Sequence, residues 1–368
     1  MRTEDLVFMR RAISLAKKGK GRTSPNPCVG AVVVRDGEIV GEGYHRKAGE
    51  SHAEVLALKR AGDLGRGSTL YVNLEPCAHH GKTPPCVDAI INAGVKRVVV
   101  AMIDPNPMVN GRGLEILKGA GIDVEVGILS EKARELNEDY EVFITKGRPF
   151  VILKMAATLD GKTSTPSGES KWISGEGSRA LVHRIRGEVD ALIVGVNTVI
   201  KDDPLLISRS RRKAKDPARI VLDSTCRIPK DSRILKDARR IRTIVATTRK
   251  APPERIESLL STGAEVLVVE EDEMGRVSVE RLLSLLGSMG MMSVMVEGGR
   301  KVARSFLDSG LIDKILLFIA PKIMGGDDSP SIFGGRGPSS LSQARDVEIR
   351  KVRRIGEDVM IEARCSRG

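Results

Sequence analysis

Hydrophobic and polar positions alternate with two periodicities along the first part of the chain, one typical of helices and one typical of strands. Residues 4–20 carry apolar side chains at helical spacing. Val29–Val34 and Ile39–Tyr44 flank the turn Asp36-Gly37, which predicts a hairpin. The same reasoning predicts helices over 51–61, 87–93, 114–119 and 130–143 and strands over 69–74 and 95–102. This alternation predicts a mixed sheet with helices on both faces.

Lys146-Gly147-Arg148-Pro149 interrupts the pattern, so we place a domain boundary there and expect domains over 1–147 and 148–368. Beyond it, short apolar runs again alternate with helical segments, which predicts a second α/β domain. The expected strands are 150–155, 191–195, 219–223, 241–247, 264–269, 293–297 and 314–320, and the expected helices are 176–187, 278–288 and 301–308.

Composition narrows the classes of function. The 368 residues are 41% hydrophobic, which is ample for two buried cores. A net charge of +12 favours anionic partners, either nucleic acid or phosphorylated metabolites, whereas 3% aromatic residues disfavour a protein that stacks single-stranded bases. Five cysteines, an odd number, favour a reducing compartment such as the cytoplasm, and no apolar run is long enough to cross a bilayer.

Candidate chemistry gathers around His52-Ala53-Glu54, Pro76-Cys77 and Cys86. One imidazole and two thiolates would hold zinc and leave its fourth tetrahedral position to water, whose pKa the metal lowers. Glu54 would be the proton carrier, because it lies beside His52 without being needed as a ligand. This is the signature of zinc deaminases, except that eight residues rather than two separate the cysteines.

Several alternatives stay open from the residues alone. His79 and His80 are rival ligands, although we favour a loop role for both. The zinc site could be purely structural in a non-catalytic binding protein, or it could belong to a nucleic-acid deaminase. Ser51 is the expected N-cap of the helix that ends near Ala61, and Glu54 has the spacing of a capping box, so Glu54 could simply cap that helix.

Motifs in both halves resemble the bifunctional riboflavin-biosynthesis deaminase/reductase family. They are Asn26–Gly30, Asn73–Cys86, Asp104–Pro107, Lys154–Lys162, Gly168–Ile173, Gly195–Val199, Asp202–Leu206 and Glu297–Gly299. The resemblance implies a cytidine-deaminase-like α/β/α domain fused to a dihydrofolate-reductase-like α/β domain. It implies hydrolytic deamination of 2,5-diamino-6-(5-phosphoribosylamino)pyrimidin-4-one, followed by NADPH-dependent reduction of the ribosyl group. It also implies one zinc per deaminase domain and a homo-oligomer, with neither nucleic acid nor membrane as partner.

The resemblance also assigns site residues. His52, Cys77 and Cys86 would bind zinc and Glu54 would be catalytic. Deaminase substrate contacts would be Asn26, His45, Lys82, Asp104 and Asn106. NADPH contacts would be Ala156, Trp172, Thr198, Asp202, Gly299, Arg300, Lys301, Val302, Ala303, Arg304 and Ser305. Apart from the resemblance, we name Ser224 and nearby arginines as candidates for the preference for NADPH over NADH. Reductase substrate contacts would be Lys154, Ser170, Arg186, Leu206, Arg209 and Glu297.

Overall fold

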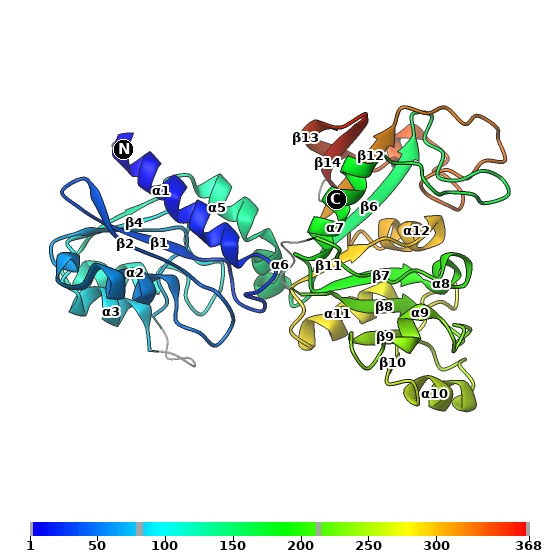
Figure 1. The fold of residues 1–368 in the computed structure, drawn as a ribbon, viewed down its shortest axis with the longest axis horizontal. Coiled ribbons are helices and arrows are strands. Elements are labelled where there is room, and N and C mark those ends of the chain that lie inside the picture. Colours follow the sequence, from blue (N-terminus) through cyan, green and yellow to red (C-terminus); the bar gives the residue numbers. More distant parts are fainter. Residues whose placement is uncertain (1–2, 79–83, 211–214, 366–368) are drawn as a thin grey trace. The chain divides into compact units, whose positions relative to one another are not determined.

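The computed structural model describes residues 3–78, 84–210 and 215–365. The chain forms two compact units, Met1–Gly147 (unit 1) and Arg148–Gly368 (unit 2), each with its own sheet (Figure 1). Within the described residues, no helix has the length and apolarity needed to span a membrane.

Unit 1 is built on a mixed five-stranded sheet. Its strands are β1 (Gly30–Arg35), β2 (Glu38–Tyr44), β3 (Thr69–Val72), β4 (Arg97–Val100) and β5 (Asp123–Val126). The spatial order is β2-β1-β3-β4-β5. The β1 strand is antiparallel to β2 and β3, whereas β3, β4 and β5 run parallel, so the predicted mixed sheet is confirmed. The short β5 was not predicted.

Helices cover both faces of the sheet, as the pattern predicts (Figure 1). Residues of α2, α3 and α4 share one core cluster with β1, β3 and β4. At Gly43 a Cβ would come within 2.3 Å of the Ala53 carbonyl oxygen, so this glycine lets β2 approach the start of α2 closely. The helices are α1 (Thr3–Ala16), α2 (Ala53–Ala61), α3 (Cys86–Asn92), α4 (Arg112–Gly119), α5 (Ser130–Leu136) and α6 (Glu138–Lys146), with 3-10 turns at Lys17–Gly19 and Gly62–Gly65.

Two local predictions in unit 1 are wrong. The N-cap of α2 is His52 rather than Ser51, and no side chain caps this helix. The helix predicted over 130–143 is two helices, α5 and α6, that meet at Asn137. The Asn137 side chain accepts a hydrogen bond from Cys28 N (2.8 Å) and donates one to Cys28 O (3.0 Å), so a contact with a distant segment accompanies the break.

Unit 2 contains a nine-stranded sheet in the order β10-β9-β8-β7-β11-β6-β12-β14-β13. The strands from β10 to β12 are parallel, and the β13–β14 hairpin adds two antiparallel strands at the edge. The strands are β6 (Phe150–Thr158), β7 (Ala191–Gly195), β8 (Ala218–Leu222), β9 (Thr243–Thr247), β10 (Glu265–Val268), β11 (Ser293–Val296), β12 (Lys314–Ala320), β13 (Val347–Ile355) and β14 (Asp358–Cys365).

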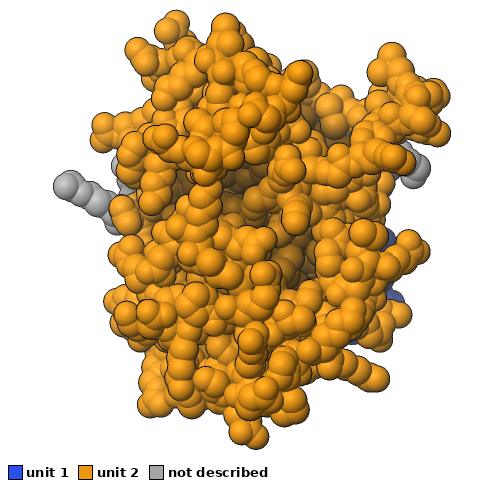
Figure 2. All heavy atoms as spheres, turned by 90° about the vertical axis from the view of Figure 1, so that its right-hand side faces the viewer, with its two compact units in different colours: residues 1–147 blue, residues 148–368 orange. Residues whose placement is uncertain are grey.

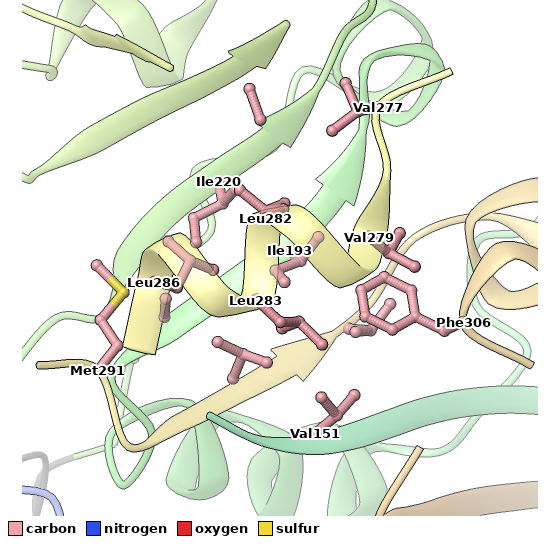
Figure 3. Close-up of a cluster of buried hydrophobic side chains, with 14 of the residues drawn as sticks. Val151, Ile193, Ile220, Val277, Val279, Leu282, Leu283, Leu286, Met291 and Phe306 are labelled. Carbon is pink, nitrogen blue, oxygen red and sulfur yellow. The ribbon is translucent and has the colours of Figure 1, made fainter. Parts of the chain in front are cut away.

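Two cores sandwich this sheet, because alternate strand residues face opposite sides. On one face Leu282 and Leu286 of α11 pack with Ile193, Val151 and Phe306 (Figure 3). The other face packs against the helices from α7 to α10. The helices are α7 (Glu176–Arg186), α8 (Val196–Asp202), α9 (Arg233–Lys236), α10 (Pro253–Leu260), α11 (Val279–Ser288) and α12 (Arg300–Asp308), with a 3-10 turn at Leu341–Gln343. The hairpin and α8–α10 were not predicted.

Candidate active sites

Three potential metal ligands converge in unit 1. His52 precedes α2, Cys77 follows β3 and Cys86 opens α3, and their ligating atoms all lie within 4.8 Å of one another. His52 Nδ1 is 3.1 Å from Cys86 Sγ and 3.5 Å from Cys77 Sγ. Hydrogen bonds from Cys86 and His52 outweigh burial and lower the pKa of Cys77 to about 4. One imidazole and two sulfurs are a donor set that fits zinc with an open fourth position.

Glu54 lies beside this cluster with an unsatisfied oxygen. Its side chain is 3% exposed, and Oε2 has no hydrogen-bond partner in the described structure. Burial raises the pKa of this carboxyl group. Because the N-cap of α2 is His52 and its side chain makes no capping hydrogen bond, the capping box expected between Ser51 and Glu54 is not formed. A buried carboxyl group with a raised pKa is suited to taking up and returning a proton.

Residues predicted for the deaminase site line a cavity of about 390 Å³ in unit 1. His52, Glu54 and Cys77 form part of its wall. The same wall contains the described residues that were expected to contact substrate, namely Asn26, His45, Asp104 and Asn106. Lys82 lies outside the described residues, as do the rival ligands His79 and His80.

His45 fixes the orientation of the Asn26 amide. His45 Nδ1 lies 3.3 Å from the Ser51 carbonyl oxygen, which can only accept, so Nδ1 carries the proton. Nε2 of the neutral ring then accepts from Asn26 Nδ2 at 3.1 Å. Burial lowers the pKa of His45 and favours this neutral form. The Asn26 Nδ2 group is therefore engaged by His45 in the cavity wall.

Two side chains that the sequence analysis did not single out shape the cavity. The Glu75 carboxylate accepts hydrogen bonds from the backbone N–H groups of Asp104 (3.1 Å), Gly111 (2.9 Å) and Gly113 (2.9 Å). Glu75 therefore holds the segment that carries Asp104. The position of Glu75 just before Pro76-Cys77 was the feature of the sequence that could have pointed to this role. Tyr140 of α6 lines the cavity, and no motif pointed to it.

Unit 2 has a cleft of about 670 Å³ where β7 and β11 end. Figure 2 views the end of unit 2 at which β7 leads into α8, and this face is hollowed. Parallel sheets commonly bind ligands at the carboxyl ends of their strands. The predicted residues that line the cleft are Lys154, Ala156, Ser170, Trp172, Arg186, Thr198, Asp202, Leu206, Arg209, Glu297, Gly299 and Arg300.

A second cavity of about 430 Å³ shares Asn197, Thr198, Gly299 and Arg300 with this cleft. This cavity is also lined by four other residues predicted to contact the cofactor, Ser224, Lys301, Val302 and Ser305. Arg227 and Arg276, which were not named from the sequence, line it as well.

Two residues predicted to contact the cofactor line neither cavity. The Ala303 side chain is buried in the core beneath α12. Arg304 donates from Nε to Asp308 Oδ1 (2.7 Å) and from Nη1 to the Arg336 carbonyl oxygen (2.7 Å).

Opposite charges meet in the wall of the larger cleft. Arg186 donates from Nε to Glu297 Oε1 (2.6 Å) and from Nη2 to Glu297 Oε2 (2.9 Å). Burial lowers the pKa of Lys154, and the negative charge of Glu297 opposes that shift. Arg186 and Glu297, both expected to contact substrate, are thus bonded to each other.

Comparison with known proteins connects both units to one family. The RibD C-terminal domain model matches residues 149–361, and the cytidine and deoxycytidylate deaminase zinc-binding region matches residues 2–102. The chain is 49% identical over 361 residues to riboflavin biosynthesis protein RibD of Aquifex aeolicus, covering 98% of each chain. It is 40% identical to the Escherichia coli protein of the same name, covering 97% of this chain and 98% of that protein.

Solved structures agree over the full length. RibD of Acinetobacter baumannii superposes with a TM-score of 0.88 at 37% identity, covering 99% of each chain. A Thermotoga maritima diaminohydroxyphosphoribosylaminopyrimidine deaminase/5-amino-6-(5-phosphoribosylamino)uracil reductase superposes with a TM-score of 0.87 at 40% identity, also covering 99% of each chain.

Fold and site together define a zinc-dependent deaminase of the cytidine-deaminase type joined to a reductase with a dihydrofolate-reductase-like fold. The chain belongs to the riboflavin biosynthesis protein RibD family. It is a bifunctional enzyme of riboflavin biosynthesis with deaminase and reductase activities, which confirms the enzyme prediction over the alternative of a non-catalytic zinc protein.

Proposed function

We propose that unit 1 deaminates 2,5-diamino-6-(5-phosphoribosylamino)pyrimidin-4-one and that unit 2 reduces the ribosyl group of the product with NADPH. The observation that carries the first half is the meeting of His52, Cys77 and Cys86 beside the buried, unsatisfied carboxyl group of Glu54. The family resemblance supplies the substrate, and the relative from Thermotoga maritima carries both activities in its name.

In the deaminase, His52, Cys77 and Cys86 would hold zinc. When bound there, the metal lowers the pKa of a water molecule and so supplies hydroxide near neutral pH. Glu54, whose buried Oε2 has no hydrogen-bond partner among the described residues, would take up the proton of the attacking water and return it to the substrate as the amine departs. Asn26 presents an acceptor and Asp104 a carboxylate to the donor groups of the pyrimidine or its sugar.

In the reductase, the smaller cavity would take the phosphate-bearing part of NADPH. Its lining includes the first residues of α12 and the cationic side chains of Arg227, Arg276 and Lys301, a chemistry that fits anionic groups. At Gly298 a Cβ would come within 2.6 Å of the Val302 side chain, so glycine permits the tight entry into α12. When bound, NADPH supplies the hydride.

The larger cleft would hold the opened sugar between Glu297 and Lys154. Glu297 remains an ionised acceptor for sugar hydroxyl groups, because the charges of Arg186 and Lys154 outweigh its burial and lower its pKa. Lys154 is our proton donor to the sugar oxygen, since its buried ammonium group gives up a proton more readily than a solvated one. Arg186 acts on substrate through Glu297.

The replacement Glu54→Gln tests the deaminase half. The variant should keep its zinc, measured by elemental analysis, and lose ammonia release almost completely, because glutamine cannot carry the proton. Glu115→Gln is the matched control, since Glu115 also lies in the first turn of a helix of unit 1 but is exposed. Ammonia release by Glu54→Gln at the rate of the unmodified protein would sink the proposal.

We further propose that the protein works in the cytoplasm as a homo-oligomer. Family membership supports both, and the five cysteines, all free thiols, are consistent with a reducing compartment.

A further inference from the structure

A helix outside the shared zinc-binding region forms part of the deaminase cavity. The match to that region ends at residue 102, whereas α6 spans Glu138–Lys146. Two side chains at its start connect it to the site in different ways. Asn137 braces the Cys28 backbone, two residues after Asn26, and Tyr140 lines the cavity itself. This helix therefore supplies structure that the common deaminase motif does not encode.

Tyr140 contacts a residue expected to bind substrate. Its side chain is 6% exposed, and its hydroxyl group donates to Asp104 Oδ1 at 3.1 Å, with Oδ2 at 3.5 Å. Asp104 Oδ1 also accepts from the Asn106 backbone N–H at 2.9 Å, and the Asp104 N–H donates to Glu75 at 3.1 Å. Glu75 thus holds the backbone of Asp104, and Tyr140 of α6 holds its carboxylate.

We propose that Tyr140 is a positioning residue for deamination: it orients the Asp104 carboxylate so that Asp104 can accept a hydrogen bond from a substrate amine or hydroxyl group. This inference rests on the deaminase function proposed above. A carboxylate held by a hydroxyl donor loses less rotational freedom when a ligand binds, so the contact favours binding rather than the proton transfers at Glu54.

Tyr140→Phe removes the hydroxyl group and leaves the ring in the cavity wall. We expect KM for ammonia release to rise roughly tenfold, the low end for the loss of a hydrogen bond to a charged group, while kcat changes less than about twofold. Tyr71→Phe is the matched control. Tyr71 is also a buried tyrosine of unit 1 whose hydroxyl group donates to a carboxylate, Asp5 Oδ1 at 2.8 Å, but it does not line the cavity. It should leave KM and kcat unchanged.

Asp104→Ala, which removes the oxygens that Tyr140 contacts, completes a double-mutant cycle that separates positioning from general support of the fold. If Tyr140 acts through Asp104, Tyr140→Phe should raise KM in the native background and have little effect once Asp104 is replaced. Equal rises in both backgrounds, or no rise in the native one, would overturn the proposal. Zinc content and the reductase activity of the same chain, assayed with deaminated substrate, should stay unchanged in every variant.

The failure of this inference is distinguishable from failure of the proposed function. An unmodified protein that releases no ammonia from the phosphorylated diaminopyrimidine would refute the deaminase function itself. An unmodified protein that releases ammonia, with a Tyr140→Phe variant of the same KM, would refute only the positioning role.

Discussion

Glu297→Gln is the replacement whose effect on unit 2 follows most directly from the structure. The pair that it breaks is forked and largely shielded from solvent, with the Arg186 and Glu297 side chains 18% and 9% exposed. Glutamine keeps the shape but removes the charge that faces both Arg186 and Lys154. The variant therefore leaves two cations in the cleft wall without their shared carboxylate.

A second pair supplies the control because it has the same geometry at the surface. Arg242 donates to Glu265 at 2.7 and 2.9 Å, close to the 2.6 and 2.9 Å of the cleft pair, but these side chains are 42% and 44% exposed. Removing one partner of a buried pair costs about 3–5 kcal/mol, whereas an exposed pair contributes at most about 1 kcal/mol. We expect Glu297→Gln to lose about 3 kcal/mol, because glutamine keeps one acceptor, and Glu265→Gln to lose less than about 1 kcal/mol.

Urea unfolding measures both losses. Far-UV circular dichroism follows the unfolding of both variants and of the unmodified protein. Equal losses in the two variants, or a loss in Glu297→Gln within the error of the unmodified protein, would refute the argument that burial makes the cleft pair the stronger one.

Three further predictions concern pH and metal. The pKa of Glu297 is lowered in the folded protein, so its charge stabilises the fold above the unfolded-state pKa, and this stabilisation is lost as pH falls through the folded-state pKa. The unfolding free energies of the native protein and of Glu297→Gln should therefore converge in acid. Burial lowers the pKa of Lys154, so the reduction rate should fall as pH rises through that pKa; Glu297→Gln should move this fall to lower pH, and an unmoved profile would count against Lys154 as donor. A chelator should stop ammonia release but spare reduction of deaminated substrate, because among the described residues the cluster suited to a metal lies in unit 1; lost reduction would contradict this.

Local sequence could predict that His52, Cys77 and Cys86 come together, because each residue lies at the end of a strongly patterned element. His52 precedes a helix, Cys77 follows a strand and Cys86 opens a helix, and in an α/β unit such junctions meet at one edge of the sheet. The second cysteine was assigned despite its unusual spacing, and its Sγ does lie 3.1 Å from His52 Nδ1.

Contacts between distant segments could not be predicted in the same way. The apolar periodicity of residues 130–143 runs through Asn137, and the bonds that accompany the helix break there reach Cys28, 109 positions away. The pairing of Arg186 with Glu297 spans 111 positions, and each residue alone looked like a substrate contact.

The C-terminal hairpin escaped prediction for a different reason. β13 is almost entirely exposed and rich in charge, so it lacks the buried apolar face from which strands are recognised. Its pairing with β14, itself paired with β12, makes it part of the sheet.

The most direct test of the account follows ammonia release and NADPH absorbance together after the phosphorylated diaminopyrimidine is added to the zinc-loaded protein. We predict that ammonia appears first and that NADPH oxidation follows and depends on it, because one unit makes the substrate of the other. NADPH oxidation that precedes ammonia, or proceeds undiminished in Glu54→Gln, would contradict the proposed order of the two reactions.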